Sequence, residues 1–268
     1  MTIVVKVGDR VMKHAFSTEA LNDLENVWRR TPSVLVHGGG DTVTGIAEKL
    51  GVHQRFVISP EGFRSRYTDM ETIQIFTMVM AGKINKEIVL HLQSRKIPAI
   101  GLSGLDGGLI RAERKKKLII KDETGRRRVI EGGYTGRVTD VDGALLKTLL
   151  DAHYLPVIAP IGLGSENEPL NLDGDRTAAY VAAAVKAESL LLMTDVDGIS
   201  LNGKHVKCFN AGEAKRSLQD LGPGMITKVF AALEALSMGI GKVIIAPGTI
   251  STPYSSAFQE LTGTVIAP

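Results

Sequence analysis

Two lysines, a triple glycine and a group of acids occur in this sequence with types and spacing that suit chemistry on an anion. Lys6 interrupts the apolar run "TIVVKVG", where an unpaired ammonium is costly. It is therefore either an edge lysine that reaches solvent or a cation held for an anion. Lys228 follows the glycines of "GPGMITK", near the start of a helical pattern. The glycines of "VHGGGD" let backbone N–H groups approach an anion at a helix N-terminus, with a plain tight turn as the alternative.

The acids lie in "LNLDGDRTAA", directly before another helical pattern. Asn171, Asp173 and Asp175 fit helix N-caps, but one cap suffices, which leaves a carboxylate for another task. An acid between two lysines and beside a glycine turn suits phosphoryl transfer, because the transferred group needs positive charge and N–H donors. The glycines fit neither a dinucleotide-binding G-x-G-x-x-G, since Val43 stands at the last glycine, nor a P-loop.

Alternating strand and helix patterns must position these residues. Most strands are apolar on both sides, which is typical of a mainly parallel sheet covered on both faces. We predict an α/β protein, an αβα sandwich, with function at the carboxyl ends of its strands. Strands are expected at 2–8, 33–37, 97–104, 155–162, 189–198 and 242–248, with a last apolar segment at 263–268. Helices are expected at 17–30, 42–51, 78–94, 143–152, 176–187 and 225–239.

Composition limits the class of protein. A chain of 268 residues, 44% hydrophobic and with 29 glycines, suits one large domain or two lobes. Cys208 is the only cysteine, so we expect no intrachain disulfide and a reducing, cytoplasmic compartment. No apolar run approaches the roughly 18 residues of a membrane span, and we expect no signal peptide. The six histidines show no metal-ligand spacing, so no protein-held metal is expected.

The stretch 111–137 is strongly basic. It carries ten Lys or Arg against four Asp or Glu, whereas the rest of the chain has 22 against 25. Two β-prone runs, at 118–120 and 129–130, flank the turn signal "DETG" and predict a hairpin that ends at a Gly-Gly break. A solvated face, a nucleic-acid patch and a docking arm are all compatible with such charge. The clusters "RKKK" and "RRR", joined by one turn, favour an arm that docks an acidic partner.

The order of "KVGD", "VHGGGD", "RYTD", "NLDGD", "TDVDG" and "GPGMITK" resembles the amino-acid kinase family over nearly the full chain. Each motif is weak alone and specific in combination. "RYTD", "AERKKK" and "GGYTGR" resemble the acetylglutamate kinase branch, in the form that acts on a carrier-bound amino acid. The resemblance implies one amino-acid kinase domain over 1–268. Its acyl-substrate lobe would span 1–165 with the basic hairpin 111–137, and its nucleotide lobe 166–268.

The resemblance also implies a reaction and its partners. ATP with Mg²⁺ would phosphorylate the side-chain carboxylate of 2-aminoadipate or glutamate attached through its amine to a small acidic carrier protein. The product would be an acyl phosphate in lysine or arginine biosynthesis. A homodimer is implied, and neither a membrane nor nucleic acid is expected as a partner. Alternatives are a kinase for free N-acetylglutamate and a non-catalytic nucleotide-dependent regulator with a nucleic-acid-binding arm.

The resemblance implies a role for each residue that matches a motif. Lys6 and Lys228 would stabilise the transition state, and Asp175 would orient them. Asp9 stands where the family usually has a second glycine. Gly39 and Gly40 would hold the phosphoryl group and a substrate carboxylate through their backbone donors. Arg66, with Arg64 as an alternative, would bind the substrate α-carboxylate, and Asn171 would also contact the substrate. The residues that line the nucleotide site would be Thr194, Asp195 and Gly224. The carrier-docking residues would be Lys115, Lys116, Arg127 and Arg128.

Overall fold

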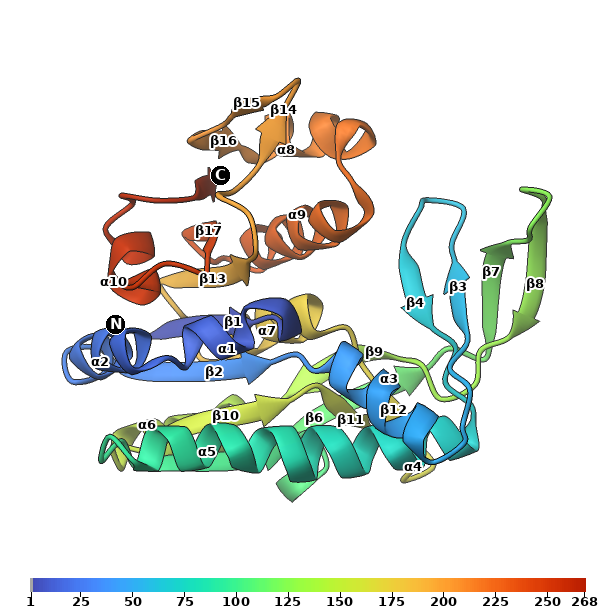
Figure 1. Cartoon of the computed structure of the whole chain (residues 1–268), viewed down its shortest axis with the longest axis horizontal. Helices are drawn as coiled ribbons and strands as arrows, with labels where there is room; N and C mark the ends of the chain where they lie inside the picture. The colour runs from blue at the N-terminus through green and yellow to red at the C-terminus, as the bar shows by residue number, and fades with distance from the viewer. Residues whose placement is uncertain (1) are drawn as a thin grey trace.

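A mainly parallel sheet of eight strands runs through the centre of the protein (Figure 1). The structure is a computed structural model that describes residues 2–268, apart from the side chain of Pro223. The strand order is β16-β18-β17-β13-β1-β2-β10-β5; β17 and β18 pair antiparallel, and the other neighbours pair in parallel. The strands are β1 (Ile3–Val7), β2 (Ser33–His37), β5 (Ala99–Ser103), β10 (Leu155–Ala159), β13 (Ser189–Thr194), β16 (Cys208–Asn210), β17 (Lys242–Pro247) and β18 (Thr264–Ala267).

Helices cover both faces of this sheet, and each face has its own hydrophobic core. Val4 belongs to one core and Val5 to the other, because successive side chains of a strand point to opposite faces. One core is formed with α6 (Gly143–Asp151), α7 (Gly174–Ala184), α8 (Ala211–Ser217) and α9 (Pro223–Ser237). The other is formed with α2 (Thr18–Trp28), α3 (Gly40–Lys49), α4 (Met70–Thr77), α5 (Asn85–Gln93) and α10 (Pro253–Phe258). The predicted αβα sandwich is confirmed.

The helix before β5 begins earlier than the sequence pattern predicted. It starts at Met70 rather than Met78, and the side chain of Asp69 caps it by accepting a hydrogen bond from the Thr72 N–H at 2.8 Å. A π-helical segment, η2 (Met78–Ile84), joins α4 to α5. Such π-helical turns are rare and often lie at functional sites. This one packs against the glycine turn that follows β2.

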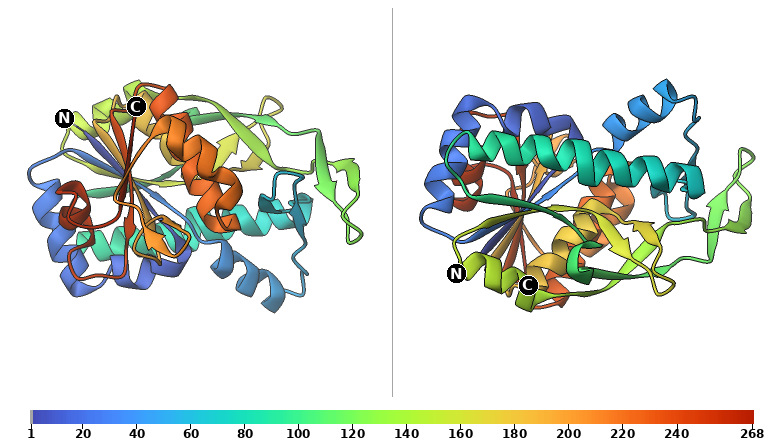
Figure 2. Two further views of the ribbon diagram at one scale, coloured as in Figure 1. Left: turned by 90° about the horizontal axis from the view of Figure 1, so that it is seen from above. Right: turned by 90° about the horizontal axis from the view of Figure 1, so that it is seen from below.

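Two hairpins project from one end of the molecule (Figures 1 and 2). They form a separate four-stranded sheet, β4-β3-β7-β8, from β3 (Phe56–Ile58), β4 (Arg64–Arg66), β7 (Lys117–Lys121) and β8 (Arg127–Glu131). The predicted basic hairpin is confirmed as β7–β8, in which Ile119 pairs with Val129. The β3–β4 hairpin was not predicted, because strands of three residues are too short to show an alternating pattern.

The basic stretch 111–137 forms a hairpin in two parts. Its base is the antiparallel pair β6 (Ile110–Arg114) and β9 (Gly136–Val141), and its tip is β7–β8. The predicted Gly-Gly break separates them on the returning strand. A Cβ atom on Gly132 would lie 1.5 Å from the Lys115 carbonyl oxygen, and one on Gly133 would lie 2.2 Å from that of Thr68. Side chains larger than hydrogen are therefore excluded where the hairpin crosses its neighbours.

The remaining elements are short. β6 and β9 continue into a second four-stranded sheet with β11 (Ile161–Leu163) and β12 (Pro169–Asn171). The others are η1 (Asp9–Val11), α1 (Met12–Ala15), η3 (Asp106–Gly108), β14 (Ser200–Leu201), β15 (Lys204–His205) and η4 (Leu218–Asp220). The expected lobe boundary at 165/166 falls between β11 and β12 and stays a prediction. Across residues 2–268, no helix has the length and apolar character needed to cross a membrane.

Candidate active site

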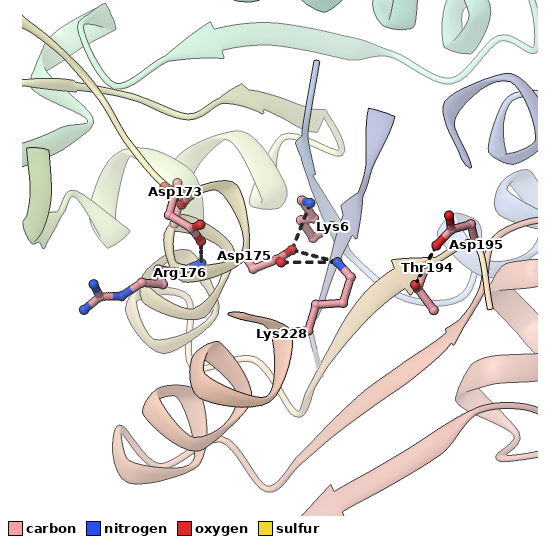
Figure 3. Close-up of polar contacts among 8 residues, drawn as sticks. Lys6, Asp173, Asp175, Arg176, Thr194, Asp195 and Lys228 are labelled. Carbon is pink, nitrogen blue, oxygen red and sulfur yellow. Dashed lines mark hydrogen bonds and ion pairs between the residues drawn. The ribbon is translucent and has the colours of Figure 1, made fainter. Parts of the chain in front are cut away.

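Three charged side chains from three elements meet beside the central strand β1 (Figure 3). Lys6 comes from β1, Asp175 from the first turn of α7 and Lys228 from α9. The Lys6 Nζ lies 2.9 Å from Asp175 Oδ1, and the Lys228 Nζ lies 3.2 Å from both carboxylate oxygens. Each of the three side chains is about nine-tenths buried. The structure thus brings together the two lysines and the acid that the sequence singled out.

Charge balance in this cluster favours an additional anion. Burial opposes the charge of Asp175, but Lys228 and Lys6 outweigh it and lower the pKa of Asp175 to about 2. Burial also opposes the charge of Lys6, and Asp175 more than offsets it, so the pKa of Lys6 is raised. Burial lowers the pKa of Lys228, because Asp175 compensates only in part and Lys6 repels it. Two ammonium groups contact one carboxylate, and Asp173 attracts both from farther away. Burial and the charge of Asp175 raise the pKa of Asp173, which weakens its compensation and leaves the lysines able to pair with a ligand anion.

Asp173 and Asp175 divide the two tasks that the sequence left open for them. Asp173 is the N-cap of α7: its Oδ1 accepts a hydrogen bond from the Arg176 N–H at 2.9 Å (Figure 3). Asp175 lies inside the first helical turn, where its carboxylate reaches the lysines instead. Because the cap is already supplied, the charge of Asp175 is available to position Lys6 and Lys228.

The glycine turn between β2 and α3 is held by Asp9. Its Oδ2 accepts hydrogen bonds from the N–H groups of Asp41 at 2.6 Å and Thr42 at 3.1 Å. Asp9 therefore stabilises the N-terminus of α3 and takes up two of its free donors. Among the described residues, none accepts a hydrogen bond from the N–H of Gly39 or Gly40. Those two donors remain for a ligand.

A buried polar network supports the same turn from below. His37 ends β2, and its Nδ1 lies 2.8 Å from the carbonyl oxygen of Gly38. Burial lowers the pKa of His37 to about 4, so the ring is neutral at pH 7. The side chain of Asn85 donates to His37 Nε2 at 3.2 Å, which makes Nδ1 the protonated nitrogen. The sequence analysis missed both residues. A polar residue inside an otherwise apolar pattern was the signal that could have indicated them.

Two cavities meet at Lys6 and the glycines at 38–40. The first, of about 500 Å³, lies against the projecting hairpins, and the second, of about 740 Å³, lies against α9 and the end of β13. Both sizes are in the range of small-molecule sites. Lys6 lines both cavities, whereas Lys228 and Asp175 line only the second among the described residues. A group passed from one cavity to the other would cross at Lys6.

The first cavity contains all the residues expected to bind substrate. Gly39, Gly40, Arg66 and Asn171 line it together with Arg64. Arg66 is buried, and its guanidinium donates to the Gly40 carbonyl at 2.6 Å and to Thr44 Oγ1 at 2.9 Å. Arg64 is exposed and stacks on the ring of Phe56, 3.7 Å from its centroid. Arg66 is thus largely committed to the start of α3.

The second cavity contains the residues expected at the nucleotide. Thr194, Asp195 and Gly224 line it, at the ends of β13 and the start of α9. Asp195 forms an ion pair with Arg10 at 3.3 Å. Burial would raise the pKa of Asp195, but hydrogen bonding and Arg10 outweigh it, so that pKa is lowered. Across the described residues no group of three His, Cys, Asp or Glu side chains is arranged to hold a metal ion.

The four residues expected to dock a carrier do not share one environment. Lys116, Arg127 and Arg128 are exposed. Arg128 lies 3.7 Å from Asp122 in the turn. Lys115 is half-buried and lines the first cavity. The surface part of the expected docking set is therefore confined to the other three, and Lys115 faces the candidate substrate site.

The chain belongs to the amino acid kinase family, which it matches over residues 1–247. A LysW-aminoadipate/LysW-glutamate kinase of Metallosphaera sedula is 46% identical over 257 residues, which cover 95% of this chain and 96% of that protein. A protein of Cenarchaeum symbiosum (strain A), provisionally given the same name, is 50% identical over 264 residues, 98% of each chain.

Solved structures agree with the fold. The smu.665 protein of Streptococcus mutans aligns over 99% of this chain and 98% of its own, with a TM-score of 0.81 and 23% identity. Carbamate kinase of Giardia lamblia bound to AMP-PNP aligns over 99% and 98%, with a TM-score of 0.69 and 16% identity. The predicted amino-acid kinase fold is thereby confirmed.

Proposed function

We propose that this protein transfers the γ-phosphoryl group of ATP to the side-chain carboxylate of 2-aminoadipate or glutamate carried on a LysW-type protein. The support from comparison is that relatives with this named activity are 44–50% identical over nearly the whole chain. The observation that carries the proposal is the meeting of the two cavities at Lys6, beside Asp175 and Lys228. One cavity would hold the acyl acceptor and the other the nucleotide.

The transfer needs positioning and charge rather than a covalent enzyme intermediate. An oxygen of the acceptor carboxylate forms a bond to the γ-phosphorus, the bond from that phosphorus to the β–γ bridging oxygen breaks, and ADP leaves. Lys6, at the junction of the cavities, stabilises charge on the transferred group, and Lys228 does so from the nucleotide side. The N–H groups of Gly39 and Gly40 would donate to the same oxygens. Asp175 positions both lysines.

Thr194, Asp195 and Gly224 are proposed to contact the nucleotide, and Asn171 the acyl substrate, since each lines the corresponding cavity. Mg²⁺ is proposed to accompany ATP, bound chiefly by its phosphate oxygens, which is the usual way this ion is held in kinases. Its charge would be added to that of the two lysines. The homodimer implied by the family resemblance is a further proposal, testable by light scattering.

The projecting basic hairpin is proposed to dock the carrier. Lys116, Arg127 and Arg128 supply exposed positive charge, and the cross-strand pair Ile119 and Val129 is also exposed. Opposite charge would steer the encounter and make it sensitive to salt. Reversing the three cations to Glu should therefore lower kcat/KM for the carrier adduct at low salt, flatten its salt dependence and leave KM for ATP nearly unchanged. Equal values at both salts would remove the hairpin from carrier docking.

The decisive experiment compares acceptors. Carrier-bound 2-aminoadipate, carrier-bound glutamate and free N-acetylglutamate are each supplied with MgATP, and acyl phosphate is trapped with hydroxylamine. Trapped product from the carrier adducts, with little from the free acid, is expected. Efficient phosphorylation of free N-acetylglutamate would instead favour the carrier-independent kinase. The two adducts side by side also reveal the preference between chain lengths, since one methylene is worth only about 1–3 kcal/mol in a fitted pocket.

A further inference from the structure

The peptide that joins Gly38 to Gly39 is held in place by a side chain rather than by the central sheet. The N–H of Gly38 still donates to the carbonyl oxygen of Val7 in β1, at 2.8 Å. Across residues 2–268, only the ring of His37 donates to the carbonyl oxygen of Gly38, from Nδ1 at 2.8 Å. The direction of this peptide therefore depends on one imidazole, because glycine on both sides leaves the backbone free to turn.

That direction decides where the N–H of Gly39 points. A trans peptide is planar, so its C=O and N–H groups point in opposite directions, and residues 2–268 contain no cis peptide bond. Within the described part of the chain, His37 is buried and lines neither of the two cavities, whereas Gly39 lines both. Because the ring holds the Gly38 carbonyl on its own side, the Gly39 N–H is directed away from the ring and toward the cavities.

Only a protonated Nδ1 can donate in this way, and the side chain of Asn85 fixes that tautomer. The Asn85 amide nitrogen lies 3.2 Å from His37 Nε2 and donates to the Val157 carbonyl at 2.9 Å. The Asn85 amide oxygen accepts a hydrogen bond from the Lys86 ammonium at 3.1 Å. The reversed amide would place its oxygen against a carbonyl and its NH₂ group against an ammonium, so the amide must donate to Nε2. The proton of the neutral ring is thereby kept on Nδ1.

We infer that His37 and Asn85 are positioning residues, which keep the imidazole proton on Nδ1 and so aim the Gly39 N–H at the phosphoryl group during transfer. The inference rests on the proposed function, in which this N–H donates to the phosphoryl oxygens. It also gives the π-helical segment η2 a role, since η2 ends directly before Asn85 and packs through Ile84 on Gly39.

The charges around the ring keep it neutral, so its tautomer and not its charge is decisive in the wild-type protein. Burial lowers the pKa of His37 to about 4, and Lys6 on β1 and Lys86 on α5 also oppose its protonation. The Gly38 carbonyl and Asp9 on η1 favour protonation, but they offset the burial only in part. The wild-type kcat should therefore show no titration of His37 at neutral pH.

The first test separates the two ring nitrogens with a matched pair of substitutions. The amide nitrogen of His37→Asn can take the place of Nδ1, whereas that of His37→Gln reaches the place of Nε2. Initial rates are measured with carrier-bound 2-aminoadipate and MgATP. His37→Asn should keep most of the wild-type kcat. His37→Gln should lower kcat about 10²-fold with smaller changes in KM, because the misdirected donor acts on charge in the transition state. Equal kcat values for the two variants would overturn the inference.

The second test reverses the tautomer with Asn85→Asp, which keeps the shape of the side chain. The new carboxylate accepts a hydrogen bond from Nε2, so the neutral ring presents an unprotonated Nδ1 to the Gly38 carbonyl. The carboxylate also raises the pKa of His37, and the protonated ring again donates from both nitrogens. The kcat of this variant should therefore rise as the pH falls from about 8 toward 6 and the ring gains its charge. A loss of kcat that is the same at every pH would indicate a merely structural role and contradict the inference.

Nitrogen-15 NMR of the imidazole rings reads the tautomer without any catalysis. His37→Asn identifies the signal of His37, because the substitution removes it from the spectrum. The wild-type ring should be protonated at Nδ1, and the ring of Asn85→Asp at Nε2 above its new pKa. A wild-type ring protonated at Nε2 would refute the inference, whether or not Asn85→Asp folds. If the wild-type ring has the expected tautomer but no acyl phosphate is trapped, the proposed function fails instead.

Discussion

Replacing Asp175 with Asn tests the central arrangement, because it removes the charge that holds both lysines while keeping the shape. Asp175 lies 2.9 Å from Lys6 and 3.2 Å from Lys228, and all three side chains are about nine-tenths buried. At an effective dielectric constant of about 20, each contact is worth roughly 5 kcal/mol before desolvation is counted. Measured losses after one partner of a buried pair is removed are about 3–5 kcal/mol. Asp175→Asn should thus lower stability by about 3 kcal/mol or more.

The same change should slow catalysis through the lysines. In the variant their ammonium groups repel each other without a carboxylate between them. Burial and this repulsion should then lower the pKa of Lys6, which Asp175 raises in the wild-type protein, and lower that of Lys228 further. The lysines are charged below their pKa, so the activity of the variant should recover as the pH falls from about 8 toward 6. At neutral pH we expect kcat to fall about 10²- to 10³-fold, the size seen when one charge-stabilising group is lost.

The assay measures kcat and KM for MgATP and the carrier adduct between pH 6 and 9, with thermal unfolding measured in parallel. Asp142→Asn is the control, because its carboxylate caps α6 away from the site and Asn caps nearly as well as Asp. Wild-type kcat in a folded Asp175→Asn protein would refute the role of this charge. A loss of kcat that does not depend on pH would refute the explanation through the lysine pKa values.

Three further predictions concern the cluster and the turn beside it. Lys6→Met and Lys228→Met should each lower kcat about 10²- to 10³-fold with a smaller change in KM for ATP, measured by steady-state kinetics; unchanged kcat would remove that lysine from the mechanism. His37 has a pKa of about 4 in the folded protein against about 6.5 unfolded, so the unfolded state binds more protons between these values. Urea unfolding should therefore show that about 3 kcal/mol of the free energy of unfolding, present above pH 6.5, is lost by pH 4. The loss should be smaller in His37→Gln; an equal loss in that variant would assign the pH dependence to other groups. Gly39→Ala should lower the free energy of unfolding by about 1–3 kcal/mol and remove much of the activity, because its Cβ would lie 2.2 Å from Ile84 Cδ1. In Gly40→Ala the new Cβ would meet nothing closer than 3.8 Å, so this variant is the control. Equal kcat values for the two variants would contradict the packing argument.

The central sheet could be predicted because strands buried on both faces are nearly continuous apolar runs. β1, β2, β10, β13 and β17 all lie where such runs stand in the sequence. The start of the long helix at Met70 was missed although its cap, Asp69, is a local signal. The π-helical segment could not be predicted, since it depends on how the helix packs on the glycine turn. The hairpin β3–β4 is held by pairing with β7 and by the contact of Phe63 with Phe230, 5.6 Å between ring centroids. These are tertiary contacts without a local pattern.

The charged residues of the candidate site could be predicted from the sequence, but the residues that hold the neighbouring glycine turn in place could not. Lys6 stood out because an ammonium inside an apolar run needs a partner. Asp175 stood out because one N-cap suffices for its helix, and Lys228 because it follows a glycine-rich helix entry. Asp9 stood out only as a departure from the family's usual glycine, and the structure reveals that its carboxylate accepts hydrogen bonds from two N–H groups of α3. His37 lies within "VHGGGD", where only the glycines were interpreted, and Asn85 belongs to no motif. The importance of both residues comes from a hydrogen-bond network that joins β2 to the long helix.

The basic stretch 111–137 shows why a count of charges along the sequence cannot predict which of them lie on the surface and which lie in a cavity. As one run, 111–137 predicts a single electrostatic surface, and the exposed Lys116, Arg127 and Arg128 fit that description. The turn of the chain between β6 and β7 places Lys115 inside the first cavity. A docking surface gains from charges that water still reaches, because they act at long range before contact. A charge inside a cavity is screened less by water and salt, so it acts mainly on a ligand in direct contact with it. One basic run therefore presents its charges to two different surroundings, which a charge count cannot separate.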